Sequence, residues 1–128
     1  MILELEQQVE QYIREHEEEA YELLKILAKI PAPSGKEEKR MEFCRDFLVQ
    51  CGAEGVYTDS ALNVVYPVGV TQEKPIAVVM AHMDVVFPDM TELPMKEEDG
   101  KLCCPGVGDD TANLTALLMC AKYIAKNH

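Results

Sequence analysis

Pro75-Ile-Ala-Val-Val-Met-Ala-His82-Met-Asp84 is the stretch of sequence that decides the predicted fold. Its apolar run from Ile76 to Ala81 has no polar alternation, which is typical of a central β-strand covered on both faces. His82 and Asp84 come next, and their side chains point the same way in an extended chain because they are two residues apart. Open α/β sheets usually bind ligands where strands end. We therefore predict a functional site at the end of this strand.

A glycine-flanked acidic pair, Gly106-Val-Gly-Asp109-Asp110, follows after one loop. Gly106 and Gly108 have no Cβ, so they let the backbone take a tight path and approach a bound group closely. Imidazole and carboxylate are ligand types that zinc and similar divalent ions take. An aspartate before a helix can also be an N-cap, and a polar pair at a strand end needs no metal. Spacing alone leaves a metal site and these structural roles open.

Helices are predicted on both sides of these motifs. Apolar positions at steps of three and four predict one or two helices over residues 5–30, which Pro31 ends. Ser34 with Glu37 predicts a capping box that opens another helix, and Gly52 ends that helix. A final helix is predicted from Thr111 to Lys126.

Short strands are predicted at residues 55–58, 62–66 and 101–104, in addition to the apolar run at 76–81. Strands that alternate with helices in this order predict an α/β fold class. A chain of 128 residues is long enough for one domain with a core.

Composition excludes several classes of partner. The formal net charge of -11 argues against nucleic acid or an anionic membrane surface. The longest apolar run is far shorter than the ~20 residues of a membrane span, and the acidic N-terminus is unlike a secretory signal. The five cysteines form no CxxC pair. We therefore expect reduced thiols and a cytoplasmic location.

Glutamates are concentrated at the start of the chain. Eight of them precede Lys25, against a single arginine, Arg14: Glu4, Glu6, Glu10, Glu15, Glu17, Glu18, Glu19 and Glu22. This pattern fits a solvated helix face and also an acidic docking surface, and the sequence leaves both possible.

Several motifs in order resemble the N-terminal part of the di-zinc exopeptidase and deacylase family. That family includes peptidase T, glutamate carboxypeptidases, carnosinase-like dipeptidases, aminoacylase and acetylornithine deacetylase. The resemblance covers most of the chain and rests on these stretches: Ile30-Pro-Ala-Pro-Ser-Gly35, Asn63-Val64, Ala81-His82-Met-Asp84, Asp99-Gly-Lys-Leu102 and Pro105-Gly-Val-Gly-Asp109-Asp110.

The resemblance implies the N-terminal fragment of a mixed-sheet zinc-exopeptidase catalytic domain, of the phosphorylase/hydrolase-like type. Residues 1–128 would be a single truncated domain that lacks the family's dimerisation domain. His82 would bind one zinc ion and Asp109 would bridge two. Asp84, the candidate for a catalytic role, would orient His82, and Asp110 would support the start of the helix. The cofactor implied is a pair of zinc ions, with cobalt or manganese as alternatives.

The implied reaction is hydrolysis of peptide or N-acyl amino-acid amide bonds by a metal-activated water. The family's Glu-Glu pair, a further acidic ligand and a late histidine are expected beyond His128, so we expect the isolated chain to be inactive. Cys103-Cys104 and Thr111-Ala112 depart from the family pattern and leave the substrate open. Cys104 lies near the motif and either packs or touches a metal.

Two further expectations complete the prediction. The competing hypothesis is a non-catalytic truncated relative or an interaction module that uses its acidic N-terminal helices. In either case an incomplete sheet would leave apolar surface and a strand edge uncovered, so we expect a homo-oligomer.

Overall fold

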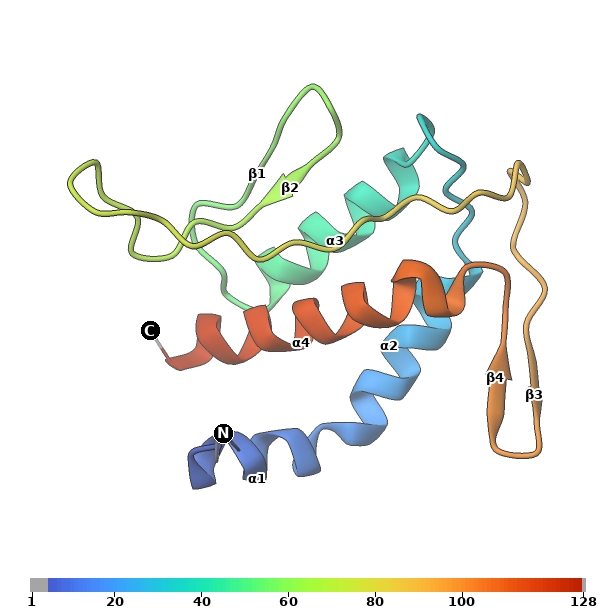
Figure 1. Cartoon of the computed structure of the whole chain (residues 1–128), viewed down its shortest axis with the longest axis horizontal. Coiled ribbons are helices and arrows are strands. Elements are labelled where there is room, and N and C mark those ends of the chain that lie inside the picture. The colour runs from blue at the N-terminus through green and yellow to red at the C-terminus, as the bar shows by residue number, and fades with distance from the viewer. Residues whose placement is uncertain (1–4, 128) are drawn as a thin grey trace.

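Two consecutive helices form the first part of the structure, a computed structural model that describes residues 5–127. They are α1 (Gln7–Glu15) and α2 (Glu17–Lys29), and the chain changes direction between them at His16 (Figure 1). The imidazole Nδ1 of His16 lies 2.8 Å from the carbonyl oxygen of Tyr12, and the two rings stack at 4.0 Å. His16 therefore packs on Tyr12 where the chain changes direction.

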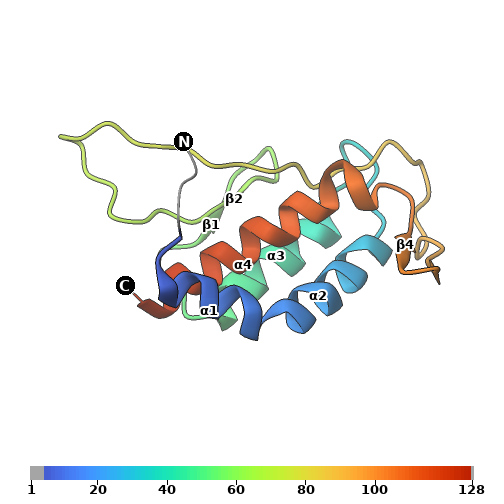
Figure 2. The same ribbon diagram turned by 60° about the horizontal axis from the view of Figure 1, so that its bottom comes forward.

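Two further helices, from later in the sequence, complete the helical layer. They are α3 (Glu38–Gln50) and α4 (Ala112–Asn127), and α4 packs against both α2 and α3 (Figures 1 and 2). Their apolar faces meet in one core, made of Leu23, Leu27, Cys44, Leu48, Ala53, Leu114, Leu118 and Met119. The predicted helices are thus confirmed, with ends shifted by a few residues.

The first helix is joined to the last. The hydroxyl of Tyr12 donates to the carbonyl oxygen of Met119 at 3.2 Å, and the Tyr12 ring meets the Tyr123 ring edge-on at 4.9 Å. Lys122, which is only 8% exposed, forms an ion pair with Glu19 of α2. These contacts hold α1 and α2 against the second half of α4.

The strands form two short hairpins. β1 (Tyr57–Thr58) pairs antiparallel with β2 (Val64–Val65), which confirms the predicted strands at 55–58 and 62–66. β3 (Lys96–Glu98) pairs antiparallel with β4 (Lys101–Cys103), the second of which was predicted. Asp99 and Gly100 link β3 to β4, both with positive φ, as a two-residue Asp-Gly turn requires.

The predicted central strand at 76–81 is wrong for this structure. The segment has no secondary structure and makes no backbone hydrogen bond with any described residue. Val79 and Met80 are 77% and 79% exposed, so neither face is covered. A strand needs a neighbour to pair its backbone and cover its side chains, and no described segment supplies one.

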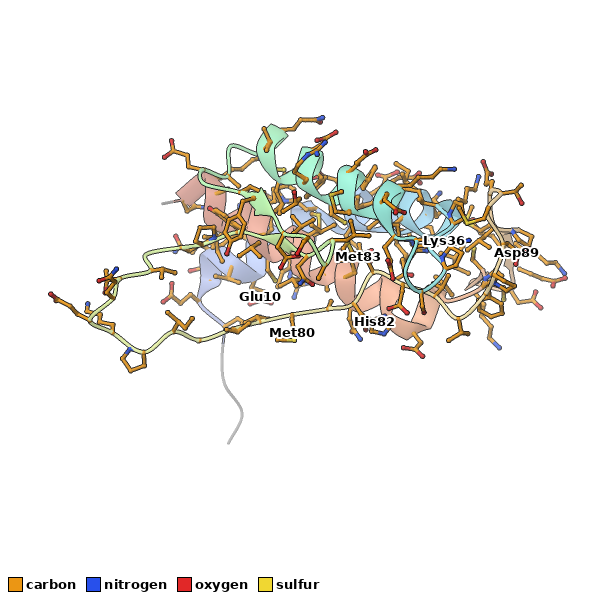
Figure 3. All side chains as sticks on the ribbon, turned by 90° about the horizontal axis from the view of Figure 1, so that it is seen from above. Glu10, Lys36, Met80, His82, Met83 and Asp89 are labelled. Carbon is orange, nitrogen blue, oxygen red and sulfur yellow. The ribbon has the colours of Figure 1, made fainter. Side chains whose placement is uncertain are left out.

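The segment 76–81 instead runs as an extended trace on one side of the helical layer (Figures 1 and 2). Seen from above, it passes Met80 before it reaches the helices around His82 and Met83 (Figure 3). Ala81 and Met83 are half-buried and pack against the core. The end of the segment therefore packs against the core, whereas its middle is exposed to solvent.

Helices and small sheets together agree with an α/β class in the broad sense. The described part of the chain contains two separate two-stranded antiparallel sheets rather than one mixed sheet, with a single parallel bridge between Pro33 and Val85. Across residues 5–127, no helix is both long enough and apolar enough to cross a bilayer.

Candidate metal centre

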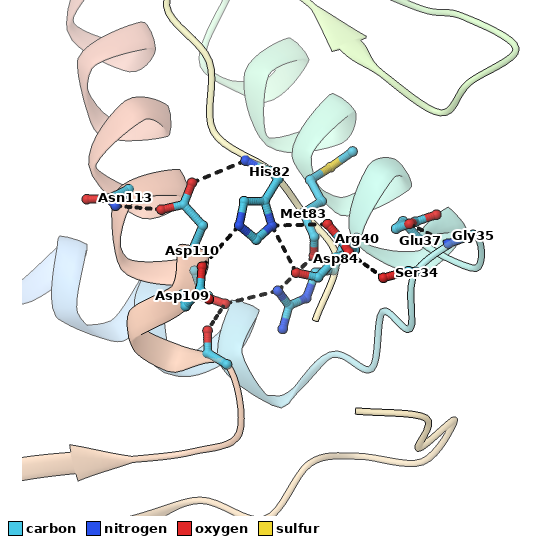
Figure 4. A network of polar contacts seen from close by, with 12 residues as sticks. Ser34, Gly35, Glu37, Arg40, His82, Met83, Asp84, Asp109, Asp110 and Asn113 are labelled. Atoms are coloured by element: carbon cyan, nitrogen blue, oxygen red, sulfur yellow. Dashed lines mark hydrogen bonds and ion pairs between the residues drawn. The ribbon is translucent and has the colours of Figure 1, made fainter. Parts of the chain in front are cut away.

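His82, Asp84 and Asp109, the three residues predicted to form the site, lie together in the structure (Figure 4). The Nε2 atom of His82 is 3.2 Å from Oδ1 of Asp109. Its Nδ1 atom is 3.0 Å from Oδ1 of Asp84 and 3.1 Å from the Asp84 carbonyl oxygen. The two nitrogens of one imidazole thus face two different aspartates, which are 25 residues apart in the sequence.

The backbone on either side of His82 is fixed by hydrogen bonds. The His82 amide donates to Oδ2 of Asp110 at 3.2 Å, and the Val85 amide donates to the carbonyl oxygen of Ala32 at 2.8 Å. Asp110 also accepts a bond from the Asn113 side chain, in the first turn of α4. Asp110 therefore supports the helix start, as predicted, and also holds the backbone that carries the imidazole.

The acidic turn before α4 depends on Gly106. This residue has a φ of 74°, and a Cβ built on it would lie 2.3 Å from Cγ1 of Val85, so a side chain cannot fit there. Gly108 has open space around it, has no positive φ, and lines the cavity described below. The peptide bond between Asp109 and Asp110 is cis. Gly106 thus lets the turn pack directly on the segment that carries His82.

Burial and hydrogen bonding shift the pKa of His82 in opposite directions. Partial burial lowers the pKa of His82, but its hydrogen bonds to Asp109 and to the Asp84 backbone outweigh this, and the net pKa is raised. The hydrogen bond from Ser34 and the nearby imidazole hold the pKa of Asp84 below its usual range. Asp84 is therefore a carboxylate at neutral pH that can hold an N–H of the imidazole.

Ser34 is a site residue that the sequence did not reveal. Its hydroxyl donates to Oδ2 of Asp84 at 2.5 Å, instead of capping α3 as predicted. Glu37 does not complete a capping box either, since its carboxylate accepts the amide of Gly35. No local pattern could have found the Ser34 contact, because the two partners are 50 residues apart.

Arg40 is a second residue that was missed. It is fully buried and contacts three neutral acceptors, and Figure 4 shows it beside the candidate site residues. Its Nε donates to the carbonyl oxygen of Ile30 at 2.9 Å, and its Nη1 donates to the carbonyl oxygen of Met83 and to Oγ1 of Thr111, both at 3.0 Å. Its position one turn before Cys44 on the buried face of α3 was the available signal.

A cavity opens over the predicted ligands. Its volume is about 400 Å³, and His82, Asp84 and Asp109 are among its lining residues. That volume lies within the range typical of sites for small molecules. The Asp109 side chain is 90% exposed, so a ligand can reach its carboxylate.

Cys104 also lines the cavity, but its thiol is engaged elsewhere. The Cys104 Sγ donates to the carbonyl oxygen of Ala28 at 3.3 Å, and burial raises the pKa of the thiol. A cysteine binds a metal ion as its thiolate. The contacts of Cys104 therefore match the packing role rather than the metal role.

His82 and Asp109 face each other, but the described residues do not form a complete set of metal ligands. Within residues 5–127, no three histidine, cysteine, aspartate or glutamate side chains are arranged to hold an ion together. A scan of the chain against models of known protein families finds no match.

Proposed function

We propose that His82 and Asp109 are zinc ligands of a metal-dependent exopeptidase or amidohydrolase. Its substrates would be peptides or N-acyl amino acids, as in the di-zinc exopeptidase and deacylase family that the sequence resembles. One observation carries the proposal: Nε2 of His82 faces a carboxylate oxygen of Asp109 at 3.2 Å beside a cavity, while Nδ1 is held by Asp84.

The separation of these two atoms fits two ligands of one ion. Zinc binds imidazole nitrogen and carboxylate oxygen at about 2.0–2.2 Å in tetrahedral sites, which places two such ligands about 3.3 Å apart. The 3.2 Å between His82 Nε2 and Asp109 Oδ1, a hydrogen bond in this structure, is close to that separation. Cobalt and manganese take the same ligand types, so the fit supports a divalent ion and not zinc alone.

The contacts of Asp84 match those of a residue that orients a metal ligand. A metal-binding histidine usually donates its other ring N–H to a carboxylate or carbonyl, which fixes its tautomer. Asp84 offers both kinds of acceptor to Nδ1, and Ser34 holds the far oxygen of the Asp84 carboxylate. With the proton on Nδ1, the lone pair of Nε2 would be available to an ion, which would replace the hydrogen bond that Nε2 now makes with Asp109.

A bound pair of zinc ions would polarise the scissile carbonyl and acidify a water molecule. The residues of this chain would hold and orient that pair, and the cavity beside them would receive the substrate. No glutamate lines the cavity among the residues that the structure describes, so we assign no general base here. We expect the chain by itself to bind metal without hydrolysing amide bonds at enzymatic rates.

Zinc binding measured by equilibrium dialysis and mass spectrometry tests the proposal. We expect at least tenfold weaker uptake by His82→Ala and by Asp109→Asn than by the parent chain. Asp89→Asn is the matched control, because Asp89 is exposed and lies outside the cavity. Equal uptake by the parent chain and Asp109→Asn would contradict the role of Asp109.

A parent chain that takes up no zinc would favour the competing hypothesis of a non-catalytic interaction module. Each glutamate of the acidic N-terminal group that the structure describes is exposed, whereas Glu4 lies outside the described residues. That exposure suits a solvated face and a docking surface equally.

A cytoplasmic location is part of the proposal. The five cysteines support it, because all of them are free thiols.

A further inference from the structure

We propose that Arg40 is a positioning residue that sets the distance between His82 and Asp109. This inference rests on the proposed function for its metal readout, but the contacts that carry it involve neither ligand directly. Arg40 lies on α3, is fully buried, and is not among the residues that line the cavity.

A single nitrogen of Arg40 joins the two segments. Nη1 donates one hydrogen bond to the carbonyl oxygen of Met83, the residue between His82 and Asp84. It donates another, also at 3.0 Å, to Oγ1 of Thr111, two residues after Asp109. The segment that carries the imidazole and the turn that carries the carboxylate therefore meet on one atom.

The third contact of Arg40 fixes the guanidinium itself. Nε donates to the carbonyl oxygen of Ile30, at the end of α2, so the planar group is held from a third direction. A lysine has one nitrogen and could not reach all three acceptors with this geometry. Thr111 completes the link, since its hydroxyl donates to the carbonyl oxygen of Gly106 at 2.8 Å while it accepts from Arg40.

Arg40 carries a buried charge whose donors are only partly used. Arg40 has five N–H donors, and its Nη2 has no partner among the described residues. Its described hydrogen-bond acceptors are two carbonyls and a hydroxyl, and no carboxylate among the described residues forms an ion pair with it. A buried cation kept without an ion pair is costly, and here its planar donors connect the two halves of the candidate site.

The test compares variants of Thr111, because replacing Arg40 itself leaves three buried acceptors unpaired and the chain could fail to fold. Thr111→Val removes the hydroxyl at nearly constant shape, and Thr111→Ser restores it. Thr115→Val is the matched control. Thr115 is a buried threonine in the first turn of α4, and its hydroxyl bonds the Thr111 carbonyl at 2.9 Å without contacting Arg40.

Two readouts are measured on each variant. The first is zinc affinity, which we expect to fall about tenfold in Thr111→Val and to stay within about twofold in Thr111→Ser and Thr115→Val. The second is amide hydrogen exchange of the metal-free chain. We expect the Val85 amide to exchange about tenfold faster in Thr111→Val than in Thr115→Val, at matched global stability.

The outcomes separate this inference from the proposed function. If the parent chain binds no zinc but Val85 exchange responds only to Thr111→Val, the metal proposal fails and the link through Arg40 stands. If Thr111→Val and Thr115→Val alter zinc affinity and Val85 exchange equally, the hydroxyl has only a structural role and the inference is overturned.

Discussion

Two apolar stretches of this chain differ in burial. The inner face of α2 is sealed in the core, where Leu27 is fully buried, whereas Val79 in the extended segment is 77% exposed. A helix pairs its own backbone groups and needs only one face covered, which α3 and α4 supply. An extended segment needs a neighbour for its backbone and for both faces. Apolar character alone therefore does not determine burial.

The largest expected difference between the two regions is in thiol reactivity. Burial raises the pKa of Cys44 to about 12. At pH 8 such a thiol presents on the order of a thousandfold less thiolate than an ordinary thiol of pKa about 8.5. We expect iodoacetamide to label Val79→Cys on the order of a thousandfold faster than Cys44, as read by peptide mass spectrometry. Labelling of Cys44 should rise as the pH is raised toward its pKa.

Equal labelling rates in urea provide the control, since unfolding removes the difference in environment. Equal rates in the folded chain would show that something covers position 79 in solution.

Next in size is the effect of deleting side-chain volume. Leu27→Ala should lower the free energy of unfolding by about 3 kcal/mol, because it leaves a cavity in the core. Val79→Ala should change it by less than about 0.5 kcal/mol, because little apolar area is lost from water. Urea denaturation measures both. A comparable loss at both positions would break the contrast between the regions.

The junction between the two regions depends on Gly106. Gly106→Ala should cost about 2 kcal/mol of unfolding free energy, because alanine disfavours a φ of 74° and its Cβ would overlap Val85. Gly108→Ala has open space around it and should be close to neutral. Thermal unfolding of the two variants distinguishes them, and a neutral Gly106→Ala would mean that the turn can move away from the segment.

The smallest effect concerns self-association. We propose that the bare segment 76–81 makes the chain a homo-oligomer by contact with a second copy. Val79→Lys should raise the dissociation constant about tenfold, since a charge on an unpaired extended segment opposes pairing. Val49→Lys adds the same charge on an exposed apolar residue of α3 and should have less effect. A parent chain that sediments as a monomer at high concentration would contradict the proposal.

The sequence allowed the helices to be predicted because their signal is local. Apolar steps of three and four, with Pro31 as a stop, define elements that need no knowledge of distant residues. The proximity of His82 and Asp109 was also predicted, but from the resemblance of several ordered motifs to a known family. Each motif by itself had a structural explanation.

Apart from that pair, the sequence did not show which distant groups contact one another. The run at 76–81 has the composition of a buried strand, but its burial depends on a partner strand that local pattern cannot supply. Ser34 fits a capping pattern, yet its hydroxyl bonds Asp84 far along the chain. Arg40 was overlooked because a charged residue on a helix is usually solvated, and only the packing reveals its acceptors.

The contact between the first and last helices has a consequence for the order of folding. Tyr12 and Met119 are joined by a hydrogen bond although they are 107 residues apart in sequence. Contacts of such separation form late, because a long loop has to close before they contribute. During synthesis α1 therefore emerges well before its packing surface exists. Its exposed glutamates would keep the unpacked helix soluble and oppose aggregation during that interval. The acidic face would therefore act before the native structure has formed.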